Sequence, residues 1–104
     1  MKLTRKCKKD FDKWFITYKP KNFMFFDKLP ISMKFGVIQD FADTKGICIG
    51  FGRSSRVDYF SAEEVHLYHT IIEDETIDYE TDSLDDIRKH TCIEFNKLYN
   101  SVMD

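Results

Sequence analysis

The stretch LPISMKFGVIQDFADTKGICIGF, residues 29–51, constrains the fold more than any other part of the chain. Its first half is apolar at helical spacing, at Met33, Val37, Ile38 and Phe41. This periodicity predicts a helix over about residues 30–43, with Pro30 in its first turn. Gly46 fits the position just after a helix, because glycine adopts a left-handed backbone without strain at a β-carbon. The β-branched and apolar residues that follow predict a strand over about 47–52.

Gly36 lies inside this predicted helix, where a glycine costs about 1 kcal/mol relative to alanine. We expect a compensating close approach of another helix or an aromatic ring, which a side chain would block. A ligand that contacts the backbone at Gly36 is the alternative, and the sequence favours packing over it.

Two further segments have the spacing of amphipathic helices. In the first, the inward positions are Leu3, Cys7, Phe11, Trp14, Phe15 and Tyr18. They predict a helix over about 4–18 with Thr4 as its N-cap. In the second, they are Ile87, Thr91, Phe95, Leu98 and Val102, which predict a helix over about 84–102. Asp82 or Ser83 fits its N-cap, and the acidic residues Asp85 and Asp86 suit its first turn.

The middle of the chain reads as a small sheet. EVHLYHTII predicts a strand over 64–72 and TIDYE a short partner strand, with a turn at EDET between them. GRSSRVDYFS, residues 52–61, predicts a polar loop, and NFMFFD, residues 22–27, fits either an extended segment or a helical turn. We therefore expect one α+β domain over residues 1–104, with three helices on an antiparallel sheet of about three strands, in the order α-α-β-β-β-α.

The composition and the positions of the cysteines predict the cellular compartment of the protein. The three cysteines, Cys7, Cys48 and Cys92, are far apart and form no CxxC motif. Charged residues follow the first methionine directly, which is unlike a signal peptide, and no apolar run approaches the roughly 20 residues of a membrane span. These features predict free thiols, no membrane association and a reducing cytoplasm. Cys48 and Cys92 are expected to be buried and inert, and Cys7 to lie in the core.

Charge is divided unevenly along the chain. Residues 1–34 hold ten Lys or Arg and three Asp, a balance of +7, whereas residues 35–104 hold six against fifteen, a balance of −9. Such polarity either steers the protein to a charged partner or draws the two halves of the fold together, and the second explanation is favoured. The acidic run from Glu73 to Asp86 reads as a solvated face, with mimicry of a nucleic acid as the alternative.

No pattern for catalysis or metal binding is found. His66 and His69 would point to opposite faces of a strand, and His90 and Cys92 lie about 200° apart around a helix, so neither pair grips one ion. No cysteine or serine is paired with a base in the sequence. We therefore expect no metal, no cofactor, no catalytic residue and no enzymatic activity.

Two groups of residues are candidate binding sites. Basic side chains on the first helix suit nucleic-acid phosphates, namely Lys2, Arg5, Lys6, Lys9 and Lys13. The stretch Arg53, Ser54, Ser55 and Arg56 combines two guanidinium groups and two hydroxyls, which suit a phosphate, a nucleotide or a carboxylate. For both groups the alternative is an ordinary solvated surface.

Two segments resemble a known group of proteins. LPISMKFGVIQDFADTKGICI, residues 29–49, is similar to a segment of small uncharacterised proteins of tailed bacteriophages and prophages, in which LPxSM, an aromatic residue, GV and GI follow in that order. SLDDIRKHTCIEFNKLYN, residues 83–100, resembles the helical ending of the same group, with Ile93-Glu94 and Tyr99-Asn100 at the matching places. Phe35 stands where many relatives have tryptophan. The resemblance implies a viral or prophage product that acts in the bacterial cytoplasm, and no activity carries over.

The resulting hypothesis is a non-enzymatic phage or prophage accessory protein that binds a host macromolecule, and one form of this hypothesis is an inhibitor of a host defence protein. It is motivated by the small size, the ten phenylalanines and the charge polarity. The alternatives are a nucleic-acid-binding protein that uses the basic first helix, and a phosphate- or nucleotide-binding protein that uses the stretch from Arg53 to Arg56. A homodimer is a further arrangement compatible with the sequence.

Overall fold

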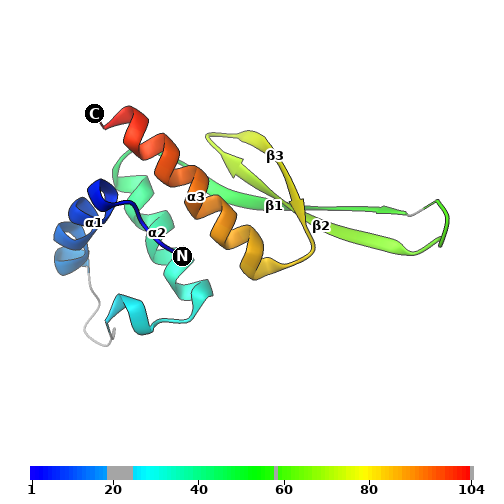
Figure 1. Cartoon of the computed structure of the whole chain (residues 1–104), viewed down its shortest axis with the longest axis horizontal. Coiled ribbons are helices and arrows are strands. Elements are labelled where there is room, and N and C mark those ends of the chain that lie inside the picture. Colours follow the sequence, from blue (N-terminus) through cyan, green and yellow to red (C-terminus); the bar gives the residue numbers. More distant parts are fainter. Residues whose placement is uncertain (19–24, 58, 104) are drawn as a thin grey trace.

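The computed structural model describes residues 1–18, 25–57 and 59–103, and its elements follow the predicted order (Figure 1). The helices are α1 (Arg5–Tyr18), α2 (Ile31–Thr44) and α3 (Leu84–Val102), with a 3-10 turn η1 (Phe26–Lys28) before α2. The strands are β1 (Ile49–Val57), β2 (Glu64–Ile72) and β3 (Glu75–Thr81). The α+β fold class is thus confirmed. The undecided stretch 22–27 ends in η1, and residues 22–24 lie outside the described ranges.

Aromatic rings from all three helices form the centre of the core. Phe41 on α2 contacts Phe11 on α1 at a centroid distance of 5.4 Å and Phe95 on α3 at 6.2 Å. These three rings and that of Tyr99 are completely buried. Burial of a large ring stabilises a fold by roughly 2–3 kcal/mol, so this cluster accounts for much of the packing between the helices. Six of the fifteen aromatic residues in the described ranges are buried, and Trp14, Phe15 and Tyr18 pack against the core while partly exposed.

The helix ends follow the sequence signals in two cases out of three. Gly46 has φ +72°, and the amides of Gly46 and Ile47 donate to Asp43 and Ala42, which is the predicted glycine ending of α2. Ser83 caps α3 by accepting from the amide of Asp86 at 3.2 Å. Thr4 lies at the predicted N-cap position of α1, where its carbonyl accepts from the amide of Lys8 at 2.7 Å, but its hydroxyl donates to Asn100 Oδ1 of α3 at 3.2 Å. The Thr4 hydroxyl thus contacts a residue that is distant in the sequence, in place of a backbone amide in the first turn of α1.

The expected close approach at Gly36 is wrong. In the part of the chain that the structure describes, no heavy atom of a neighbouring element lies within 4 Å of a β-carbon built at this position. Neither a helix nor a ring therefore requires glycine here, and α2 carries the conformational cost of Gly36 without a packing gain.

The sheet is antiparallel, in the order β1-β2-β3, and its helix-covered face is identified by its contacts. Phe51 of β1 contacts Phe35 of α2, and Thr70 of β2 contacts Thr91 of α3. The turn between β2 and β3 has two central residues, Glu73 and Asp74, with φ values of 52° and 65°. Positive φ at both positions matches the turn type that suits the twist of a two-residue hairpin.

The predicted loop over 52–61 is wrong in its first half, because β1 continues to Val57. Every residue from Ile49 to Val57 has a partner in β2, ending with Val57 opposite Glu64. The polar sequence GRSSR forms a strand because β2 supplies its backbone hydrogen bonds, which do not depend on side-chain type. Within the described residues, no helix is both long and apolar enough to cross a membrane.

Candidate functional site

A two-stranded arm extends from the sheet and is the most prominent feature of the surface (Figure 1). We define the arm as residues 53–57 and 59–67. Strand β3 ends opposite Tyr68, so from Leu67 outward β2 has only β1 as a neighbour. All described arm residues of β1, from Arg53 to Val57, are exposed. The molecule measures 51 × 32 × 19 Å, and its radius of gyration of 15.5 Å exceeds the ~13 Å of a compact chain of this length.

The tip of the arm presents aromatic side chains to solvent. Tyr59 is 99% exposed and Phe60 is 101% exposed, and Val57 beside them is 65% exposed. Aromatic residues of this size are normally among the best buried, and contiguous exposed ones mark interaction sites. The tip is therefore the strongest candidate for contact with another molecule.

Residues 61–63, next to these rings, have one internal hydrogen bond and one strained backbone conformation. Ser61 Oγ accepts a hydrogen bond from the amide of Glu63 at 3.3 Å. Ala62 has φ 57°, a left-handed conformation that costs a residue with a β-carbon roughly 1–2 kcal/mol. Strained residues of this kind gather at functional sites, where the conformation serves something other than stability.

The base of the arm is held by a row of aromatic contacts. Phe51 lies between Phe35 of α2, at 5.5 Å, and Tyr68 of β2, at 5.9 Å between ring centroids. The guanidinium of Arg88 on α3 lies over the Phe51 ring at 5.9 Å. These contacts fix the direction in which the arm leaves the body, because they tie β1 and β2 to two helices at the point of departure. The arm is therefore preorganised, which lowers the entropy lost on binding.

The four residues of the predicted phosphate site do not converge. Because side chains alternate along a strand, Arg53 and Ser55 lie on the helix-covered face of the sheet and Ser54 and Arg56 on the open one. Arg53 Nη2 lies 2.7 Å from His66 Nδ1, and Ser54 Oγ lies 2.6 Å from His69 Nε2. Arg56 forms an exposed ion pair with Glu80 at 3.4 Å. Two guanidinium groups on opposite faces cannot clasp one phosphate.

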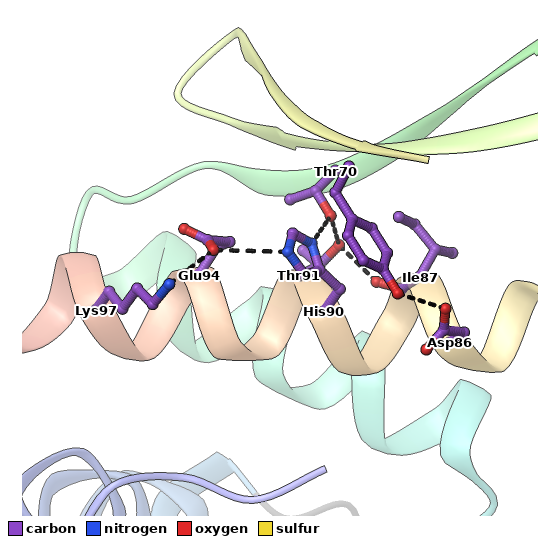
Figure 2. A network of polar contacts seen from close by, with 8 residues as sticks. Thr70, Asp86, Ile87, His90, Thr91, Glu94 and Lys97 are labelled. Carbon is purple, nitrogen blue, oxygen red and sulfur yellow. Dashed lines mark hydrogen bonds and ion pairs between the residues drawn. The ribbon is translucent and has the colours of Figure 1, made fainter. Parts of the chain in front are cut away.

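A second polar group, missed by sequence reasoning, joins α3 to the sheet (Figure 2). His90 Nδ1 lies 2.7 Å from Thr70 Oγ1, which lies 3.1 Å from Thr91 Oγ1. The His90 ring stacks on Tyr79 of β3 at 3.8 Å, and the Tyr79 hydroxyl donates to Asp86 at 2.6 Å. On the other side, His90 Nε2 lies 3.6 Å from Glu94, which also pairs with Lys97.

The hydrogen bonds of this network have one consistent direction. Thr91 donates to the carbonyl of Ile87 at 2.8 Å, so its single hydroxyl proton is used. Thr70 must then donate to Thr91, which leaves its lone pair for a proton on His90 Nδ1. Thr70 and Thr91 are completely buried, so the hydroxyls cannot meet a substrate, and the network serves to fasten α3 to β2.

The thiols differ from one another in accessibility. Cys7 and Cys92 are buried as predicted, and burial raises the pKa of Cys7 to about 12 and that of Cys92 to about 11. Both are therefore protonated and unreactive at neutral pH. The prediction that Cys48 is buried is wrong: it is exposed and lies just before β1, where its carbonyl accepts from the amide of Glu73.

The histidines lie as the strand periodicity predicts, with His66 and His69 on opposite faces of β2. Among the residues that the structure describes, no group of three or more His, Cys, Asp or Glu side chains is arranged to hold a metal ion.

The basic side chains of the N-terminal region are divided between two roles. Arg5, Lys9 and Lys13 lie four residues apart on the exposed face of α1, and Lys2 is exposed before the helix. Lys6 instead donates to the carbonyl of Met103 at 2.7 Å, at the C-terminus of α3. A cation is favourable there because the last carbonyls of a helix carry partial negative charge. Lys6 thus has a structural role that the sequence did not indicate.

Comparison of this chain with protein-family models, with curated proteins and with solved structures found no match.

Proposed function

We propose that this protein is a non-enzymatic accessory protein of a phage or prophage that binds a host protein through the arm. The observation that carries the proposal is the pair Tyr59 and Phe60, both fully exposed on a turn held away from the body. Aromatic side chains dominate the energy of protein interfaces, and a few of them in a desolvated pocket supply most of the affinity.

The shape of the arm defines the kind of partner. A single turn offers too little area to bind a flat surface, since stable interfaces bury about 800 Å² per partner. A cleft in a partner protein would contact the arm on several sides and would bury the tip together with both strands behind it. We therefore infer that the partner has a concave, apolar cleft, and occupation of such a cleft is a means of inhibiting a host protein.

The charge of the arm favours a protein partner over a nucleic acid. Its described residues include two arginines, Arg53 and Arg56, and two glutamates, Glu63 and Glu64. The sequence of residues 53–67 also includes Asp58, which brings the balance to −1. Such an arm gains little from phosphate neutralisation, which supplies most of the affinity of non-specific nucleic-acid binding. The resemblance of residues 29–49 and 83–100 to phage and prophage proteins supports a host protein in the bacterial cytoplasm as the target.

The experiment compares two double variants in a pull-down from bacterial lysate. The test variant is Tyr59→Ser with Phe60→Ser, and the control is Ile16→Ser with Ile93→Ser, which removes apolar groups that are 79% and 51% exposed elsewhere. We expect the unmodified protein and the control to recover one stoichiometric partner and the test variant to lose it.

A photo-crosslinking residue at position 59 then identifies the contact, and titration calorimetry with the purified partner measures the affinity. The proposal is overturned if the tip variant binds as tightly as the control, or if no variant recovers a partner.

A further inference from the structure

The exposed face of α1 carries a row of three cations, Arg5, Lys9 and Lys13, which we call the basic row. Four residues advance a helix by about 6 Å, so the row is about 12 Å long and follows the helix axis. Within residues 1–18, 25–57 and 59–103, no carboxylate lies within ion-pair distance of a basic-row side chain. The basic row therefore makes no ion pair with those residues.

The acidic residues of α1 are engaged by other groups. Asp10 accepts a hydrogen bond from Tyr99, which lowers the pKa of Asp10 and keeps it ionised but turned towards α3. Asp12 pairs with Lys8 at 2.5 Å. Asp12 is thus paired outside the basic row, and Asp10 is turned towards α3, although the charge of Lys13 also helps to lower the pKa of Asp10. Because α1 holds five Lys or Arg against two Asp, it keeps a net charge of +3 and attracts an external anion.

We propose that the basic row binds the phosphate backbone of a nucleic acid, without reading its sequence. A linear array of evenly spaced cations suits a linear array of phosphates, and neutralisation of phosphates supplies affinity through counterion release. This site is separate from the arm: α1 lies at one end of the long axis and the arm projects from the other (Figure 1).

Two other anionic partners fit the surface less well. Insertion into a lipid surface requires the apolar face of a helix, and that face of α1 is in the core, with Cys7 and Phe11 completely buried. An acidic protein would require apolar contact area as well as charge, and the exposed face of α1 adds only Ile16.

The distribution of charge over the molecule favours one orientation of the protein as it approaches a nucleic acid. Carboxylates gather on β3 and at the start of α3, where Glu75, Asp78, Glu80 and Asp85 lie. These groups repel a polyanion, while the basic row attracts it. The protein would therefore meet a nucleic acid with α1 foremost and leave the arm free for its own partner.

The test is fluorescence anisotropy with random-sequence duplex DNA, single-stranded DNA and RNA across a salt series. For three phosphates neutralised, the slope of log K against log salt is about −2.7 on duplex DNA, or about a 40-fold loss of affinity between about 50 and 200 mM salt. The test variant is Arg5→Gln, Lys9→Gln, Lys13→Gln. The control is Lys28→Gln, Lys89→Gln, Lys97→Gln, which removes the same charge from exposed side chains outside α1.

We expect the test variant to lose binding at least tenfold and the control to retain it, with both showing the circular dichroism and unfolding temperature of the parent. Equal losses in the two variants would mean that only net charge matters and would overturn the proposal. So would the absence of binding at low salt, or binding to anionic lipid vesicles in place of nucleic acid. The Tyr59 and Phe60 variant should bind nucleic acid normally, which separates this proposal from the one on the arm.

Discussion

Tyr99 of α3 donates a hydrogen bond to Asp10 of α1 across 89 positions of the chain. The Tyr99 ring is completely buried, whereas Asp10 is only partly buried. Burial and the neighbouring carboxylate raise the pKa of Tyr99, and the hydrogen bond from Tyr99 lowers the pKa of Asp10. The bond thus links the N-terminal helix to the C-terminal one while Asp10 is ionised.

Tyr99→Phe is expected to destabilise the protein by about 1.5 kcal/mol at neutral pH, because it removes a hydrogen bond to a charged acceptor. The folded pKa of Asp10 lies below its unfolded value, so this stabilisation is present above about pH 4 and is lost as pH falls through the folded pKa. Urea unfolding from pH 3 to pH 7 measures it, with Asp10→Asn as a second variant. An equal loss at both ends of that range would contradict the assignment.

Gly36→Ala is expected to stabilise the protein by about 1 kcal/mol, because the site is in a helix interior with open space for a β-carbon. Gly46→Ala is the matched control and should destabilise by a similar amount, since Gly46 has φ +72°. Thermal and chemical unfolding of the two single variants provide the comparison. Loss of stability in Gly36→Ala would contradict this prediction.

Neutral His90 is expected to carry its proton on Nδ1, as the direction of the threonine hydrogen bonds requires. His90→Asn places an amide donor near the Nδ1 position and should be less destabilising than His90→Gln, which places it near Nε2, by about 1 kcal/mol. Long-range ¹⁵N NMR of the imidazole reports the tautomer directly. Observation of the Nε2–H form would mean that His90 Nδ1 accepts from Thr70, and it would contradict the hydrogen-bond directions assigned here.

Ala62→Gly is expected to stabilise the tip of the arm by about 0.5–1 kcal/mol, because glycine accepts φ 57° without strain while the unfolded chain gains some entropy. Ala62→Val should have the opposite effect. Hydrogen exchange of the arm amides is the appropriate measurement, since the arm can open without global unfolding. Faster exchange in the glycine variant would mean that the left-handed conformation is not populated in solution.

The order of elements was predictable because each signal was local. Helix periodicity placed α1, α2 and α3 within one residue of their observed ends, and the β2 limits agree with the prediction. The outer half of β1 was missed because GRSSR has no apolar alternation, and its pairing is a property of β2 rather than of its own side chains. Thr4 and Lys6 were misjudged because their partners, Asn100 and Met103, are distant in sequence.

The candidate sites were harder to predict than the fold. The exposed aromatic tip follows from the length of the hairpin, since Tyr59 and Phe60 in a short loop against the body would have been partly covered. The basic row was visible as a periodicity, but the loss of Lys6 from it was not. The polar network around His90 depends on the position of α3 over β2, which periodicity alone does not determine.

The arm has a consequence for solubility as well. Strand β1 is at the edge of the sheet along its whole length, and β2 becomes a second edge beyond Tyr68. Unpaired backbone groups on such edges invite pairing with another molecule, which leads to aggregation. Arg53 and Arg56 lie on the two faces of this ribbon, so an incoming strand from a second copy would bring like charges together. The stretch GRSSR, which cannot clasp a phosphate, thereby disfavours edge-to-edge pairing of the arm with a second copy of the chain.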